Sequence, residues 1–360
     1  MQASGELLMV MRLIYRWCLG MALIPLVACQ NCGSNCHGAE LVAFTSSETL
    51  TEFEFDGPAL LIHGGAGWVV PERYDSVELA AAHASLRRAL AEGQRLLEGG
   101  AAAVDVVEHV LGILEDDSLY NAGRGAVVTE EGIAELDAAI MTGHDLNAGA
   151  VAGVRTVKNP SKLARAVLDS SRHVFLIGRG AEAFAVAQGL ETVSNDYFIT
   201  HSRAKQIARW KEEQKMGTVG VVVLDAEGHV AAGTSTGGMN RKQWGRVGDV
   251  PVIGAGTYAN DAGAAVSCTG HGEYFIRHQI AGQVSLRHEL GNAPLSHTVH
   301  HMLFDVLNAE AGSGGLIAID SSGQAVLEFN SPGMYRGAWG QVGGRDTVYT
   351  ALFGRAPEAK

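Results

Sequence analysis

A short apolar run at residues 219–224 constrains this chain more than any other feature, because six consecutive buried-type residues predict a strand in the interior. A turn sequence follows at residues 225–228, and a second strand pattern then runs to Thr236. The same hairpin pattern recurs at residues 316–329. Strands joined by such short turns pair antiparallel, and helical patterns lie between them. We therefore predict an α+β fold in which mainly antiparallel sheets are covered by helices.

Thr218 stands directly before this run and follows Gly217. A hydroxyl at the first position of a buried strand could act as a nucleophile if the chain is cut before it. A terminal threonine carries an α-amine with a pKa of ~7.7–8.0, and this amine can activate the hydroxyl as a nucleophile. Gly217 has no side chain to hinder attack on its carbonyl. Taken alone, residues 217–220 fit an ordinary strand start at least as well.

Downstream residues favour the cut. Thr234-Ser-Thr236-Gly-Gly238 places hydroxyls beside two glycines. Arg246 and Asp249 could hold the α-carboxylate and α-ammonium of an amino acid, although a plain surface ion pair is the alternative. Thr269-Gly270 could offer a hydroxyl and a backbone N–H to an oxyanion, or could simply be a turn before a helix. Helices are expected at residues 273–290 and 296–308.

Composition bounds the size and the partners. The chain has 360 residues, of which 47% are hydrophobic, enough for a large core in one or two domains. Its formal net charge is −12, and dense basic clusters are absent away from the N-terminus and residues 203–215. Nucleic-acid binding is therefore not expected.

The N-terminal segment predicts export. Arg12 and Arg16 precede a short apolar stretch that ends in Leu26-Val-Ala-Cys29, which resembles a bacterial lipobox. We expect residues 1–28 to be a lipoprotein-type signal peptide and Cys29 to carry a lipid anchor at the cell envelope, with Gln30 pointing to the outer membrane. The alternative is an ordinary secretory signal and a soluble periplasmic protein. Residues 29–57 are expected to form a tether, and 58–360 a single domain.

Several glycine-rich motifs occur in a fixed order along the chain. Upstream they include His63-Gly-Gly-Ala-Gly67, Asn121-Ala-Gly123 and Asp137-Ala-Ala-Ile-Met-Thr-Gly143, and downstream Gly217–Gly220, Gly245-Arg-Val-Gly-Asp249, Gly254-Ala-Gly256 and Thr269-Gly-His-Gly-Glu273. Together they resemble the plant-type L-asparaginase/isoaspartyl peptidase family. The resemblance runs from about residue 60 to about residue 340.

The resemblance implies an N-terminal nucleophile hydrolase, a four-layer αββα sandwich. It implies self-cleavage into an α chain ending at Gly217 and a β chain of residues 218–360, assembled as a dimer of αβ units. The implied activity is hydrolysis of β-aspartyl bonds in isoaspartyl dipeptides and L-asparagine, releasing L-aspartate. The implied site consists of the nucleophile Thr218, the supporting hydroxyls of Thr236 and Thr269, and the substrate clamp of Arg246 and Asp249. Thr269 and Gly270 would form or flank the oxyanion hole, and Asn121 would lie near it.

The resemblance also implies a structural Na⁺ ion and no cofactor for catalysis. The ion would be bound by backbone carbonyls of Leu114, Glu115, Asp117, Tyr120, Ala122 and Arg124. An ordinary acidic turn without metal is the alternative. Two other functions stay open: a glycosylasparaginase-type hydrolase of the glycan–asparagine bond, and a degenerate lipoprotein without activity. His297, His300 and His301 share one face of a predicted helix, but without an accompanying carboxylate motif they indicate a polar surface rather than a metal site.

Overall fold

A computed structural model describes residues 49–200, 217–291 and 293–354. The predicted signal peptide, Cys29 and most of the predicted tether lie outside these residues, as does the segment 201–216 that precedes the predicted cut. Within the described residues, no helix has both the length and the apolar composition needed to cross a membrane.

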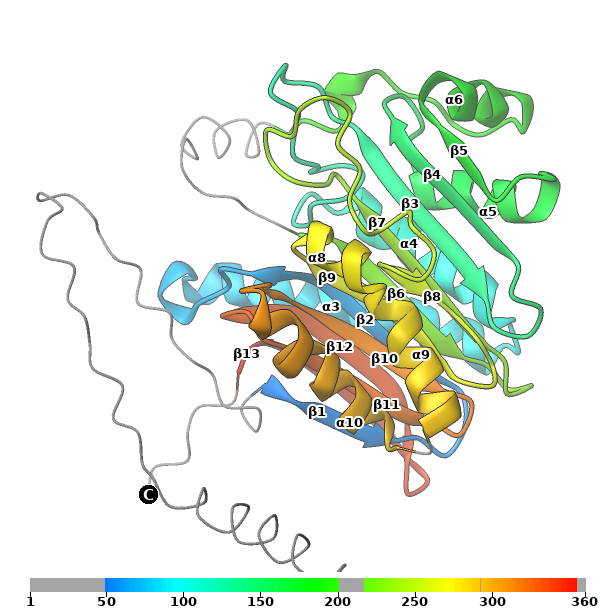
Figure 1. Ribbon diagram of the computed structural model, residues 1–360, viewed down its shortest axis with the longest axis vertical. Coiled ribbons are helices and arrows are strands. Elements are labelled where there is room, and N and C mark those ends of the chain that lie inside the picture. Colours follow the sequence, from blue (N-terminus) through cyan, green and yellow to red (C-terminus); the bar gives the residue numbers. More distant parts are fainter. Residues whose placement is uncertain (1–48, 201–216, 292, 355–360) are drawn as a thin grey trace, which may run out of the picture. The chain divides into compact units, whose positions relative to one another are not determined.

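Two sheets form the centre of the molecule (Figure 1). All neighbouring strands pair antiparallel except β4 and β5, which are parallel. The larger sheet has the order β13 (Arg345–Phe353), β12 (Gly333–Val342), β2 (Ala59–Gly67), β6 (Val219–Leu224), β7 (Val230–Thr236), β3 (Leu136–Thr142), β4 (Ala148–Val154), β5 (Phe175–Ile177). The smaller sheet has the order β1 (Thr51–Glu54), β11 (Gln324–Phe329), β10 (Gly314–Asp320), β9 (Ala264–Gly270), β8 (Thr257–Tyr258).

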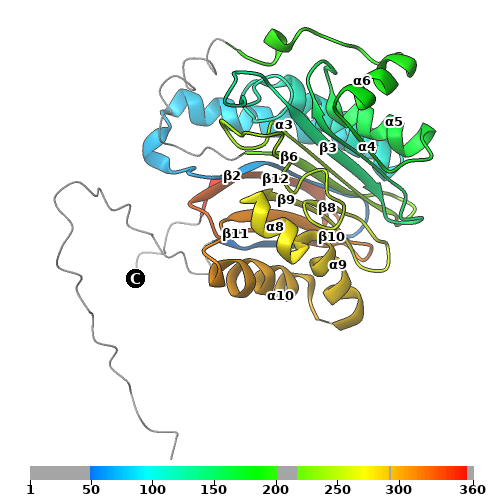
Figure 2. The same ribbon diagram turned by 45° about the horizontal axis from the view of Figure 1, so that its top comes forward.

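Helices cover the outer face of each sheet, so that the layers run helix, sheet, sheet, helix (Figure 2). The larger sheet is covered by α3 (Ser76–Glu98), α4 (Ala103–Asp116), α5 (Pro160–Ser170) and α6 (Gly178–Ala187). The smaller sheet is covered by α8 (Gly272–His278), α9 (Ile280–Gly291), α10 (Leu295–His300) and the π-helical segment η4 (His301–Leu307). Two short 3₁₀ turns complete the described elements, η2 (Pro71–Arg73) and η3 (Asn195–Tyr197). The predicted αββα sandwich is confirmed.

Strand β6 shows why the apolar run at residues 219–224 needs this architecture. Every residue of β6 is buried. Val219, Val221 and Val223 belong to the core under α3–α6, whereas Val222 and Leu224 belong to the core between the two sheets. A strand that is covered on both faces must be apolar at consecutive positions. Thr218 is carried at the head of this strand, at the edge of the space between the sheets.

Two expectations about element boundaries are wrong. The predicted tether extends too far, because residues 51–54 form edge strand β1, in which Thr51 pairs with Leu327 of β11. The single helix expected at residues 273–290 is two helices, α8 and α9. Gln279 has a φ of 50°, in the left-handed region, and ends α8 there. Neither feature has a strong local signal, since both are stabilised by contacts with distant strands.

Two of the three histidines at the α10–η4 junction contact carboxylates. His300 Nδ1 lies 2.9 Å from Glu328 Oε1, and His301 Nδ1 lies 2.9 Å from Asp305 Oδ2. No cluster of three or more metal-ligating side chains is found in the described part of the chain. The Glu328 side chain is fully buried in β11, and burial, partly offset by His300, raises the pKa of Glu328 from 4.5 to about 7.

Glu328→Gln is expected to change how stability depends on pH. A carboxyl whose folded-state pKa is raised favours folding while protonated, and this contribution is lost as pH rises through about 7. As pH rises from about 5 to about 8, the wild type should lose up to about 3 kcal/mol of unfolding free energy relative to the variant. Urea unfolding of both proteins at the two pH values measures this difference. A pH-independent difference would contradict the assignment.

Candidate active site

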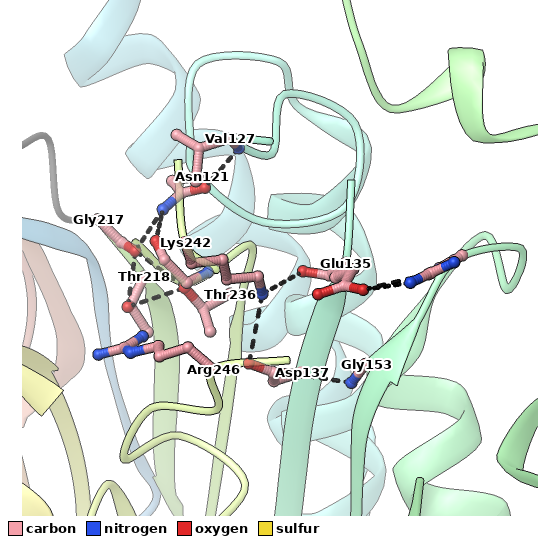
Figure 3. Close-up of polar contacts among 12 residues, drawn as sticks. Asn121, Val127, Glu135, Asp137, Gly153, Gly217, Thr218, Thr236, Lys242 and Arg246 are labelled. Carbon is pink, nitrogen blue, oxygen red and sulfur yellow. Dashed lines mark hydrogen bonds and ion pairs between the residues drawn. The ribbon is translucent and has the colours of Figure 1, made fainter. Parts of the chain in front are cut away.

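The carbonyl oxygen of Gly217 is the focus of the site (Figure 3). It lies 2.9 Å from Asn121 Nδ2, 3.0 Å from Thr236 Oγ1 and 2.7 Å from Thr218 Oγ1. Hydrogen bonds of this kind draw electron density from the carbonyl carbon and make it more open to attack. The polarised carbonyl therefore lies directly beside a hydroxyl that could attack it.

Thr218 and Thr236 share a small hydrogen-bond network. Both side chains are buried, and their hydroxyl oxygens lie 3.2 Å apart. Thr236 Oγ1 also accepts a hydrogen bond of 2.9 Å from the backbone N–H of Gly238. Since the hydroxyl of Thr218 has a single hydrogen, it can donate either to Gly217 or to Thr236 at one time. When it donates to Thr236, its hydrogen points away from the Gly217 oxygen, and a lone pair can face the carbonyl carbon.

Asn121 is fixed in the orientation that this contact requires. It lies in the loop after α4, and its Nδ2 also donates to the carbonyl of Gly238 at 2.8 Å. Its Oδ1 accepts from the backbone N–H of Val127 at 2.8 Å. With donors and acceptor all matched, the amide cannot flip without losing several hydrogen bonds. Asn121 is therefore held in a fixed orientation beside the Gly217 carbonyl.

Glycines allow the backbone to pack closely around residues 217–220. Gly65 of β2 has a φ of 107°, and a Cβ there would lie 2.9 Å from Gly217 Cα. Gly220 of β6 lies under His63 and Ser267, whose side chains would collide with any Cβ. His63 Nε2 lies 3.0 Å from Ser267 Oγ, and burial lowers the pKa of His63 to about 3, so this imidazole is neutral. At both Gly65 and Gly220, therefore, a larger residue would collide with neighbouring atoms.

Arg246 and Asp249 face the same pocket as Thr218. The pocket is lined by Gly217, Thr218, Thr236, Gly238, Met239, Arg246, Gly248, Asp249, Val250 and Gly270. Its volume is about 10 Å³, room for a single water molecule. Asp249 is buried, its Oδ2 has no hydrogen-bond partner in the described part of the chain, and burial raises its pKa to about 7. An unsatisfied carboxylate of this kind fits a cationic ligand group.

Thr269 and Gly270 occupy the end of β9. Gly270 lines the pocket, but Thr269 is fully buried behind it and its Oγ1 accepts a hydrogen bond of 3.2 Å from the backbone N–H of Ala66. Through this bond Thr269 joins the end of β2 to β9. The structure thus brings Thr218, Thr236, Arg246, Asp249 and Gly270 together, with Asn121 and Thr269 in contact with the backbone around them.

The loop between α4 and Gly125 has features that fit a cation. A Cβ on Gly125 would lie 2.7 Å from the Ser118 carbonyl oxygen and 2.8 Å from that of Tyr120, so these oxygens converge. The Glu115 carbonyl accepts a hydrogen bond of 2.7 Å from Arg124 N and keeps a second lone pair. Carbonyl oxygens suit a hard cation. The Glu115 carboxylate points elsewhere, since it accepts hydrogen bonds from Ser161 and Ser235.

The sequence did not reveal that a lysine side chain, that of Lys242, is buried behind the site. The Lys242 side chain is 1% exposed, and its Nζ donates to the Glu135 carbonyl at 2.8 Å and lies 3.9 Å from Asp137 Oδ2 (Figure 3). Asp137 pairs with Thr236 across β3 and β7. Lys242 thereby fixes the segment that carries Gly238 and Arg246. A buried lysine in a polar, glycine-rich segment has no sequence signal that distinguishes it from a surface lysine.

Comparison with known proteins agrees with the site. A family model described as asparaginase matches residues 56–349. An isoaspartyl peptidase of Escherichia coli is 46% identical over 310 residues, covering 82% of this chain and 95% of that protein. A probable isoaspartyl peptidase/L-asparaginase of Arabidopsis thaliana is 41% identical over 314 residues, covering 78% and 95%, respectively. The human isoaspartyl peptidase/L-asparaginase is 38% identical over 287 residues, covering 77% and 91%.

The family model spans most of the chain, and relatives at 38–46% identity each cover more than three quarters of it. Residues of three motifs that carry the sequence resemblance, among them Thr218, Asp249 and Gly270, also line one pocket in the structure. We conclude that this protein belongs to the asparaginase family.

Proposed function

We propose that this protein is a self-activating amidohydrolase that cleaves β-aspartyl bonds, with isoaspartyl dipeptides and L-asparagine as its substrates. The observation that carries the proposal is the Gly217 carbonyl, held by Asn121 and Thr236 beside the Thr218 hydroxyl. Arg246 and Asp249 in the same pocket add the means to hold an α-amino acid. Membership of the family and the names of its relatives support the same substrate class.

Activation begins with attack of Thr218 Oγ1 on the Gly217 carbonyl carbon. The C–O bond forms, the C–N bond breaks, and the hydroxyl proton passes to the departing amine of Thr218. Asn121 and Thr236 stabilise the negative charge that develops on the Gly217 oxygen. Water then hydrolyses the resulting ester. Gly217 becomes a carboxyl terminus, and Thr218 gains a free α-amine.

Hydrolysis of substrate repeats this chemistry on an external carbonyl. The α-amine of Thr218 removes the proton from its own hydroxyl, which attacks the β-carbonyl of the aspartyl group. The C–N bond breaks, the amine or ammonia leaves with a proton, and a β-aspartyl ester remains on Thr218. Arg246 binds the α-carboxylate and Asp249 the α-ammonium, while Thr236 and Gly270 line the pocket around the reacting carbonyl, with Thr269 buried behind Gly270 and Asn121 beside Gly217. Water then releases L-aspartate.

Further proposals concern the surroundings of the site. A Na⁺ ion held by carbonyls of the 114–124 loop would stiffen the loop that carries Asn121, and supplies no chemistry to the reaction. We also propose lipidation at Cys29, attachment to the cell envelope and a dimer of αβ units. Intact mass with N-terminal sequencing of the processed protein reports the cut before Thr218 and a lipid on Cys29 together.

Thr218→Ala should abolish both cleavage and hydrolysis, because it removes the one hydroxyl that attacks in each step. On a denaturing gel the wild type should give two chains and the variant one. The purified wild type should release L-aspartate faster from a β-aspartyl dipeptide than from glycosylated asparagine. A single persistent chain in the wild type would rule out self-activation.

Asn121→Ala should slow self-cleavage on the order of 100-fold, since it removes one of the donors to the Gly217 oxygen. A time course of cell-free synthesis, followed on denaturing gels, gives the rate. Asn195→Ala is the matched control, because Asn195 also bridges backbone groups, at Ala134 and Arg155, away from Gly217. Equal rates in both variants would argue against the role of Asn121.

The affinity for L-aspartate should rise with pH through about 7. Burial raises the pKa of Asp249 to about 7, so the carboxylate that accepts the α-ammonium is present above this pH and is lost below it. Succinate lacks the ammonium and serves as the control ligand. Inhibition constants for the two ligands, measured between about pH 5.5 and 8.5, should diverge by about 10-fold. Parallel profiles would exclude Asp249 as the ammonium partner.

A further inference from the structure

Glu273 holds one edge of the Arg246 guanidinium. Arg246 Nε donates to Glu273 Oε1 at 2.9 Å, and Nη2 donates to Oε2 at 3.1 Å. Such a bidentate pair fixes the plane of the guanidinium as well as its position. Glu273 lies in the first turn of α8, within the Thr269–Glu273 motif, and neither step of the proposed chemistry uses it.

The opposite edge of Arg246 faces the pocket. A Cβ on Gly248 would lie 2.7 Å from Arg246 Nη1, and one on Gly238 would lie 3.5 Å from it, so Nη1 lies between two residues that line the pocket. A carboxylate bound at Nε and Nη2 leaves both Nη1 hydrogens and one Nη2 hydrogen for a second carboxylate. Figure 3 shows Arg246 near Thr218, and both residues line the same pocket.

Glu273 is the carboxylate that forms an ion pair with Arg246 among the described residues. Asp249, although nearby, is not within ion-pair distance of the guanidinium. Partial burial alone would raise the pKa of Glu273, but the hydrogen bonds and charge of Arg246 outweigh it and leave this pKa below its usual range. Glu273 is therefore ionised at neutral pH and can pair with Arg246 in the free protein.

We propose that Glu273 is a positioning residue for substrate binding, which holds Arg246 so that its Nη1 edge meets the α-carboxylate of the aspartyl group. The proposal rests on the proposed function, because it takes Arg246 as the carboxylate partner. It differs from competition, in which Glu273 would occupy the place of the substrate carboxylate. Glu273 and the pocket lie at different edges of the guanidinium, which favours positioning.

The test is binding of L-aspartate and β-alanine to the cleaved protein by calorimetry, together with steady-state kinetics on a β-aspartyl dipeptide. β-Alanine is L-aspartate without its α-carboxylate. In Glu273→Ala, Kd for L-aspartate and KM should rise about 3- to 10-fold, the cost of leaving one long side chain unordered. Glu273→Gln keeps one acceptor for Arg246, so its Kd and KM should lie between those of Glu273→Ala and the wild type.

Three readouts separate positioning from general damage. Self-cleavage and kcat should stay within about 2-fold of the wild type, since Arg246 makes no contact with the Gly217 carbonyl. Binding of β-alanine should not change. Glu310→Ala is the matched control, because it removes other polar contacts of α8, those of Glu310 with Arg277 at 2.7 Å and with His278 at 3.1 Å, and it should leave Kd and KM unchanged.

Tighter binding in Glu273→Ala would establish competition and overturn the proposal, as would unchanged L-aspartate binding or an equal loss for β-alanine. Failure of the proposed function has a different signature. In that case the wild type itself would neither hydrolyse the dipeptide nor bind L-aspartate.

Discussion

The hydrogen bonds to the Gly217 carbonyl oxygen are the interaction on which the rest of the site depends. Their donors come from three places far apart in the chain: the loop after α4, the end of β7 and the head of β6. Each donor is held by further bonds, such as those from Asn121 to Gly238 and from Val127 to Asn121. The sandwich serves to bring these segments to one point with little freedom.

Buried charge is the second constraint on this region. Asp137, Lys242 and Asp249 are buried within one glycine-rich region, and Arg246 lies partly exposed in the same region. Ionised groups in such a place are stable only with partners, and Lys242 and Arg246 have them. Asp249 lacks a hydrogen bond to its Oδ2. This imbalance is what a binding site for a small zwitterion requires, since the ligand supplies the missing charges.

Much of the fold could be predicted because its central strands carry strong local patterns. The run at residues 219–224 is apolar at every position except Gly220, which predicts a strand covered on both faces, and the short turn after it fixes its antiparallel neighbour. Strand β1 was missed because four residues of mixed polarity become a strand only by pairing with β11. The break at Gln279 was missed because a left-handed residue other than glycine depends on its packing.

The residue types of the candidate site could be identified from the sequence, since Thr218, Thr236, Arg246 and Asp249 occur in motifs with recognisable spacing and order. Their mutual geometry was decided only by the tertiary structure. The sequence placed Asp249 three residues from Arg246, yet the ion pair of Arg246 is with Glu273, 27 positions away. Pairing of this kind depends on which strands and helices meet. Local sequence determines residue type and strand period, whereas the partners of a buried charge are set by contacts between distant segments.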